Sequence, residues 1–204
     1  MPSWFDRLRA LFSDTGSPLA AEEIEALSKL RMMSAGDWTC ECCGKTMSGI
    51  PDIAFNSPDC WPHDYNYESN ADLRYEGDFL SSDFCVVDGE TFFVRTVMSF
   101  SIQNLDHELG IGVWSTLSRD NFEAYAKDLE DEAAEGGAEY FSWLGNAIPH
   151  VADDGPLQTY IVTRGGAMRA IVVAQQDTVA GYGQANGLKP SIALDLLRMG
   201  EHTL

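Results

Sequence analysis

Apolar side chains at helical spacing open the chain. They first recur over residues 1–12, where charged residues interrupt them. The members of this N-terminal stripe are Trp4, Phe5, Leu8, Leu11 and Phe12. A second stripe, over residues 20–33, has acidic residues in its first turn and basic residues near its end, which suits the dipole of a helix. Because small residues at 34–36 end this stripe, we predict a helical arm over residues 1–36 and a main domain over residues 37–204.

The clearest strand pattern in the main domain is a hairpin around the dipeptide Asp88-Gly89. Two runs rich in β-branched and aromatic residues flank this dipeptide, which favours a two-residue hairpin loop. Such a loop places Cys85 opposite Phe92 and gives the second run one apolar face. The residues of this predicted core face are Phe92, Val94, Thr96, Met98, Phe100 and Ile102.

A helix is predicted to begin at Arg119, because Ser118 can cap its first turn. Its apolar stripe consists of Phe122, Tyr125, Ala126 and Leu129. The opposite face is acidic and is expected to face solvent.

The other predicted elements are a strand over residues 110–117, a short helix over 140–144, strands over 157–163 and 167–173, and a last helix beginning at Pro190. The glycine-rich residues 181–187 are interpreted as a flexible turn, because their spacing departs from that of a dinucleotide-binding loop. Together these patterns predict an α+β fold with a mostly antiparallel sheet and flanking helices, preceded by the N-terminal helical arm.

Charge narrows the set of partners. The chain has 32 acidic and 13 basic residues, a formal net charge of -19. Such a surface repels phosphate backbones, so we expect no direct contact with nucleic acid. It attracts basic proteins, although acidic surfaces also serve solubility. No apolar run approaches the roughly 20 residues that cross a bilayer, and charges interrupt the N-terminal stripe, so we predict a cytoplasmic protein with no transmembrane segment.

The strongest chemical pattern is a knuckle, residues 40–45, that contains three of the five cysteines. Cys40 and Cys43 have the two-residue spacing that lets both thiolates face one ion, and Gly44 permits the tight turn that follows. Cys60 and His63 repeat the same spacing sixteen residues further on. The pattern predicts a structural zinc site with these four ligands.

Other arrangements of the cysteines remain open. Cys60 and His63 lie in a loop between prolines and could simply be exposed. Cys42 or Cys85 could replace one of the four ligands, although a lone strand cysteine such as Cys85 is more often a small buried hydrophobe. No thioredoxin-like pattern surrounds the knuckle, which argues against redox chemistry.

The sequence contains no recognisable catalytic motif, and in particular no serine in a nucleophile elbow. Aromatic residues in the polar loop after Cys60 form a further candidate site, either as a protein-binding patch or as cover for the domain edge. These residues are Trp61, Tyr65, Tyr67 and Tyr75.

Several separated segments, in order, are typical of one bacterial family. They are Cys40 to Lys45, Gly49 to Pro51, Leu80 to Glu90, Phe92 to Arg95, Gly112 to Ser118 with Asn121 and Phe122, and Tyr140 to Leu144 with Pro149. In these segments the chain, from Trp38 to about Met199, resembles the DUF2199 family, for which the resemblance implies no activity. The family knuckle tends to have a histidine where Met47 stands here. This departure leaves Cys60 and His63 as local replacements, raises Cys85 as another ligand, or means that no metal binds.

We therefore carry two main hypotheses. The first is a protein-interaction module with a structural zinc site, which neutralises a basic partner such as a toxin nuclease, as an immunity protein would. The second is a metal-dependent hydrolase, which needs three protein ligands and an open water position. A lesser hypothesis attaches the N-terminal stripe to a membrane surface, although packing on the domain or on a partner is favoured, since the net charge opposes anionic lipid.

Overall fold

The computed structural model describes residues 19–131, 133–152 and 155–200. The predicted helix over residues 1–12 lies outside this part of the chain. The helices are α2 (Ala21–Ser34), α3 (Arg119–Glu130), α4 (Val179–Asn186) and α5 (Pro190–Met199), with a short 3-10 helix η1 (Asn70–Asp72). The strands are β1 (Asp37–Thr39), β2 (Thr46–Ser48), β3 (Ile53–Ala54), β4 (Phe79–Leu80), β5 (Phe84–Val87), β6 (Thr91–Ser101), β7 (Glu108–Leu117), β8 (Glu139–Trp143), β9 (Gln158–Val162) and β10 (Ile171–Ala174).

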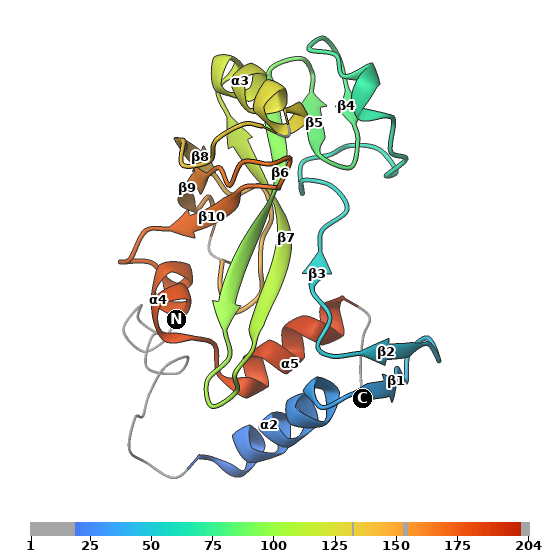
Figure 1. Cartoon of the computed structure of the whole chain (residues 1–204), viewed down its shortest axis with the longest axis vertical. Coiled ribbons are helices and arrows are strands. Elements are labelled where there is room, and N and C mark those ends of the chain that lie inside the picture. Colours follow the sequence, from blue (N-terminus) through green and yellow to red (C-terminus); the bar gives the residue numbers. More distant parts are fainter. Residues whose placement is uncertain (1–18, 132, 153–154, 201–204) are drawn as a thin grey trace.

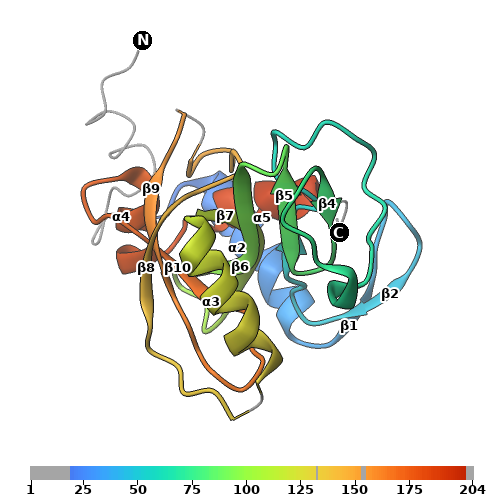
Figure 2. The ribbon, with the colours of Figure 1, turned by 90° about the horizontal axis from the view of Figure 1, so that it is seen from above.

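The long hairpin of β6 and β7 is the spine of the larger sheet (Figure 1). The strand order is β3-β7-β6-β10-β9-β8. β5 pairs with the first residues of β6, before the point where β10 pairs, and β4 pairs with β5. Figure 2 shows β8, β9 and β10 on one side of this spine and β4 and β5 on the other. Only the β3–β7 and β6–β10 pairs are parallel among the described strands. The predicted α+β class, with a mostly antiparallel sheet and flanking helices, is confirmed.

Both faces of β6 are buried. The predicted core face is confirmed, since Phe92 and Val94 pack with Phe122 and Tyr125 of α3. The alternate face was expected to be polar, but Phe93 and Arg95 are buried there as well. This second face is covered by the loop before β4, where the Phe55 carbonyl and the Tyr67 hydroxyl accept hydrogen bonds from Arg95. It holds a small apolar cluster, which consists of Leu80, Cys85, Phe93 and Trp114 with Trp61 and Phe55 at its margin.

The predicted hairpin turn is correct, but its register is wrong by one residue. The Val87 carbonyl accepts a hydrogen bond from the Glu90 amide, as a turn around Asp88-Gly89 requires, yet Val87 pairs with Thr91. Cys85 therefore lies opposite Phe93 and not opposite Phe92. The turn is held by the preceding segment, because the Gly89 amide donates to Gly77 and the Asp88 amide donates to Asp78.

Two predicted elements are wrong. Residues 140–144 are not a helix, because residues 139–143 pair with β9 as strand β8. A short apolar run carries no period of its own, and the neighbouring strand decides its structure. Residues 181–187 are not a flexible turn, because Val179–Asn186 form α4. Gly181 is needed there because a Cβ at this position would collide with the Gln175 carbonyl.

Helices α2 and α5 pack against each other at one end of the sheet (Figure 1). Leu30 and Met33 of α2 are fully buried in the main core, whereas Ile24 of the predicted stripe is 57% exposed. Pro190 begins α5 as predicted. The division of the chain at residue 36 stays a prediction, since α2 shares its core with the elements that follow it.

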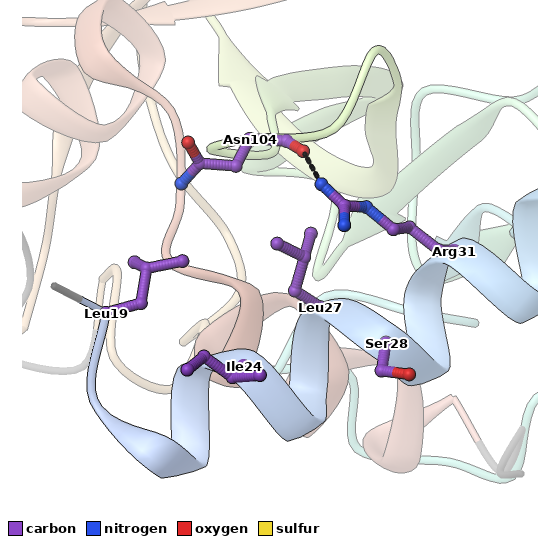
Figure 3. Close-up of a pocket in the computed structure, with 6 residues that line it drawn as sticks. All are labelled: Leu19, Ile24, Leu27, Ser28, Arg31 and Asn104. Carbon is purple, nitrogen blue, oxygen red and sulfur yellow. Dashed lines mark hydrogen bonds between the residues drawn. The ribbon is translucent and has the colours of Figure 1, made fainter.

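A hollow of about 410 Å³ lies between α2 and the loop that joins β6 to β7. Arg31 closes one end of it, where its guanidinium donates to the Asn104 carbonyl at 3.3 Å. Figure 3 shows Leu19, Ile24 and Leu27 on the α2 side of this hollow. The hydrogen bond from Arg31 to Asn104 joins α2 to the loop at the tip of the β6–β7 hairpin.

Candidate metal centre

The knuckle is the turn of a small antiparallel hairpin that lies outside the large sheet. β1 and β2 pair Trp38 with Met47, and the Trp38 indole donates to the Gly49 carbonyl at 2.8 Å. The ladder continues into the knuckle, where the Cys40 amide donates to the Lys45 carbonyl at 2.9 Å. Gly44 has a φ of 67°, a left-handed conformation that favours glycine, as the sequence predicted.

This turn gathers the sulfur atoms of Cys40, Cys42 and Cys43. The three Sγ atoms lie within 4.8 Å of one another, and those of Cys40 and Cys42 are 2.9 Å apart. Cys40 is buried, and the other two cysteines are exposed. Zinc binds thiolate sulfur at about 2.3 Å, so two sulfurs on one ion are at most about 4.6 Å apart. A cluster of this size could hold a metal ion after small side-chain adjustments.

The neighbouring thiols raise the proton affinity of Cys42. The pKa of the Cys42 thiol is raised to about 11, first by its hydrogen bond with Cys40 and also by the neighbouring Cys43. Crowded thiols stay protonated because adjacent thiolates repel each other. A cation removes this repulsion and releases the protons, which is the usual linkage between metal binding and thiol ionisation.

The knuckle lies inside a region shared with known bacterial sequences. Residues 39–188, more than half of the chain, match the family described as uncharacterized protein conserved in bacteria, DUF2199. The chain belongs to the DUF2199 family. The matched region includes all three clustered cysteines and the whole large sheet, but α2 and α5 lie outside it. No curated protein and no solved structure matches this DUF2199 chain.

Two of the predicted zinc ligands of this DUF2199 chain do not join the cluster. Among the described residues, Cys40, Cys42 and Cys43 form the one group of three or more potential ligands at such short spacing. Cys60 follows Asp59, whose amide is bonded to Gly145, and His63 bonds Asp78. The set of Cys40, Cys43, Cys60 and His63 stays a prediction. Cys42, which was not one of the four predicted ligands, is in the cluster. The crowding of three cysteines in residues 40–43 is the sequence feature that indicates it as an alternative ligand.

Cys85 serves packing in the DUF2199 fold. It is fully buried beside Phe93 and Trp114. Burial raises the pKa of its thiol, and the nearby Cys60 and Asp78 raise it further. A thiol held protonated by apolar surroundings is a poor metal ligand and a poor nucleophile.

His63 and Asp78 form an exposed pair, with 2.6 Å between Nε2 and a carboxylate oxygen. The pKa of Asp78 is lowered, first by the Asp88 amide and then by His63. Cys60 makes no hydrogen bond to His63 in the described chain, and burial raises the pKa of its thiol. The pair therefore lacks an activated nucleophile.

The loop aromatics mainly cover the second face of the sheet. The Tyr67 hydroxyl donates to the Asn56 carbonyl at 2.7 Å and accepts from the buried Arg95 at 3.2 Å. Tyr75 differs, because it packs edge-on against Phe122 of α3 on the first face. Tyr65, in contrast, is 60% exposed.

No helix in the described part of this DUF2199 chain is long and apolar enough to cross a membrane.

Proposed function

We propose that this chain is a zinc-stabilised binding protein of the cytoplasm that recognises a basic protein partner. The observation that carries the proposal is the cluster of three cysteine sulfurs in the knuckle. Thiolate sulfur is the ligand type that selects zinc over magnesium or calcium. A reducing compartment keeps such thiols available for metal.

In this proposal the ion has a structural role. It fixes the turn from Cys40 to Lys45 and so holds the β1–β2 hairpin in register. Through Trp38, which packs into the main core, the hairpin joins the layer formed by α2 and α5. Two short strands of three residues each have little stability of their own, and the bound ion supplies the missing order.

The partner is argued from charge. The outer face of α3 and the segment after it expose carboxylates that lack a basic partner among the described ion pairs. These are Asp120, Asp128, Glu130, Asp131 and Glu135. In a chain with a net charge of -19, such a face accelerates encounters with basic proteins. A basic toxin nuclease is one partner of this kind.

The metal half of the proposal is tested by elemental analysis of the purified protein under reducing conditions. We expect about one zinc per chain, and loss of zinc in Cys40→Ser and in Cys43→Ser. Cys42→Ser and Cys60→Ser are the deciding pair. Loss in the former alone assigns the observed trio, whereas loss in the latter alone assigns the set predicted from spacing. A metal-free wild-type protein would refute this half.

The partner half is tested by affinity capture at low and high salt, about 50 and about 500 mM, because screening weakens exposed charge contacts. The bait is compared with a variant in which the five carboxylates above are changed to amides. A control variant changes two exposed carboxylates on α2, Glu22 and Glu25, to amides and shows the effect of removing negative charge elsewhere on the surface. We expect a basic protein on the wild type and the control only, released by salt. Equal capture by all three baits would contradict the proposal.

A metal-dependent hydrolase is the alternative function. It is favoured by one observation, namely that two of the three clustered cysteines are exposed, which leaves a side of the ion open to water. X-ray absorption separates the two functions. Four sulfur or nitrogen ligands indicate a structural ion, and a bound water oxygen beside three sulfurs indicates a catalytic one.

A further inference from the structure

A groove beside the β9–β10 loop brings two arginines together. It has a volume of about 540 Å³, and its walls include Arg164 and Arg169 from this loop and Asp83 from the start of β5. Two guanidinium groups face one carboxylate here, so the groove is locally positive in a chain with a net charge of -19. Opposite local charge inside a groove concentrates anions there.

The hydrogen bonds of the two arginines leave donors free. Arg169 donates from Nε to Asp83 at 2.7 Å and from Nη2 to the Ser82 carbonyl at 3.2 Å. Arg164 donates from Nε to the Arg169 carbonyl at 2.7 Å. Within the described chain, both terminal nitrogens of Arg164 and Nη1 of Arg169 make no hydrogen bond. Planar guanidinium donors of this kind match the oxygens of a carboxylate or phosphate.

Asn70 also lines the groove and contacts the same carboxylate as Arg169. Asn70 donates from Nδ2 to Asp83 at 2.8 Å, which fixes its amide orientation, since the ionised carboxylate accepts only. Its Oδ1 atom is buried and has no hydrogen-bond partner. Because this atom is fully enclosed by the protein, a ligand in the groove does not reach it. Asn70 instead helps to hold the Asp83 carboxylate that bonds Arg169.

The loop that carries the arginines has a fixed and unusual backbone. Gly165, Gly166 and Ala167 all have positive φ values, of 70°, 61° and 57°. The Gly166 amide donates to the Ala134 carbonyl at 3.3 Å, which ties the loop to the segment after α3. A left-handed alanine in a groove wall is a strained residue of the type found at binding sites.

We propose that this groove binds a small organic oxyanion, with a carboxylate or phosphate head attached to an apolar body. Arg164 and the free Nη1 of Arg169 bind the head, while Asp83 holds Arg169 in place. Leu129 and Met168, which also line the groove, cover the apolar body. This inference is independent of the knuckle and of the acidic face.

The test titrates the labelled full chain with four probes and follows backbone amides by NMR. Phenyl phosphate and benzoate share an apolar ring and differ in the head, inorganic phosphate has the head alone, and benzyl alcohol has the body alone. Probe concentrations reach about 20 mM, which covers the weak affinity of so few atoms. We expect saturable shifts of the amides from Gly165 to Arg169 with at least one ring-bearing anion, and weaker binding of the other two probes.

Arg164→Gln should weaken this binding at least about tenfold, because it removes charged hydrogen bonds. Arg198→Gln is the matched control, since it removes the same charge from an exposed position on α5. Met168→Glu should also abolish binding through repulsion of the anion. Saturation by phosphate or by carboxylate alone supports the site and identifies the head. No saturable shift with either anion, or equal affinity in Arg164→Gln and the wild type, would overturn it.

Discussion

The turn between β1 and β2 and the strand β5 both carry cysteine, but they surround it differently. In the turn, three sulfurs face one another, and two of the three cysteines are exposed. On β5, Cys85 is enclosed by Leu80, Phe93 and Trp114. The turn has little apolar packing of its own, whereas the strand lies between two covered faces. The chemistry open to each cysteine is therefore decided by its neighbours, which are other thiols in the turn and apolar side chains around β5.

The largest loss of stability is expected from a substitution on β7, in the apolar surroundings of Cys85. Trp114 is fully buried beside Cys85, and its indole donates to the Phe55 carbonyl at 3.1 Å. Trp114→Ala should lower the free energy of unfolding by about 3–5 kcal/mol, because it leaves a large cavity. It also removes one of the two hydrogen bonds to the Phe55 carbonyl, which keeps the one from Arg95. Urea unfolding measures this. Trp143→Ala, at an exposed position on β8, is the control and should cost under about 1 kcal/mol.

Metal removal is the matching experiment on the turn. If zinc is held in excess at about 100 times its dissociation constant, a chelator should lower the free energy of unfolding by about 3 kcal/mol. Thermal scans with and without chelator measure the loss. Cys85→Ala should respond to chelator as the wild type does, and Cys40→Ser should not respond. A chelator response that survives Cys40→Ser would mean that the ion binds elsewhere.

Asp83, next to β5, tests a polar contact that needs no metal. Burial raises the pKa of this carboxyl, but hydrogen bonds from Ser82, Asn70 and Arg169 outweigh burial and lower it overall. Asp83→Asn should cost about 1–3 kcal/mol at neutral pH. A lowered pKa stabilises the fold above the pKa of the unfolded carboxyl, about 3.9, and this stabilisation is lost as the pH falls through the folded value. The gap between variant and wild type should therefore narrow below about pH 4. A gap that stays constant down to the acid transition would contradict this assignment.

The smallest effects separate the cysteines themselves. Cys85→Ala should cost about 1 kcal/mol, because it removes one buried heavy atom. In metal-free protein, Cys43→Ala should cost under about 0.5 kcal/mol, because this side chain is exposed. Denaturant midpoints in the presence of chelator give both values. Equal costs at the two positions would contradict the difference in packing between β5 and the turn.

Local chemistry made part of this fold predictable from sequence. Ser118 caps α3 through the Asn121 amide, and Pro190 begins α5. The turn at Asp88-Gly89 follows from residues that accept positive φ. The register beyond this turn depends on Gly77 and Asp78, which bond the turn amides from outside the hairpin. No pattern within the two strands contains that information.

The candidate site, like the fold, has one part that the sequence predicts and another that it does not. The knuckle was predictable because Cys40 and Gly44 act within one turn. The placement of Cys60 and His63 was not, since equal spacing in sequence does not say where a loop lies. The loop is held by Asn146, which donates to Asp59 at 2.8 Å across 87 positions of chain. Contacts of this range are set by the assembled sheet.

The contact between Glu23 of α2 and Ser191 of α5 joins two helices that are synthesised at different times. The Glu23 carboxylate accepts from the Ser191 amide at 3.0 Å and from its hydroxyl at 2.7 Å, across 168 positions. A ribosome releases α2 well before α5, the helix that packs against its apolar side. Leu30 and Met33 therefore stay uncovered by α5 while the residues between the two helices are made, and we expect chaperones to bind α2 during this interval.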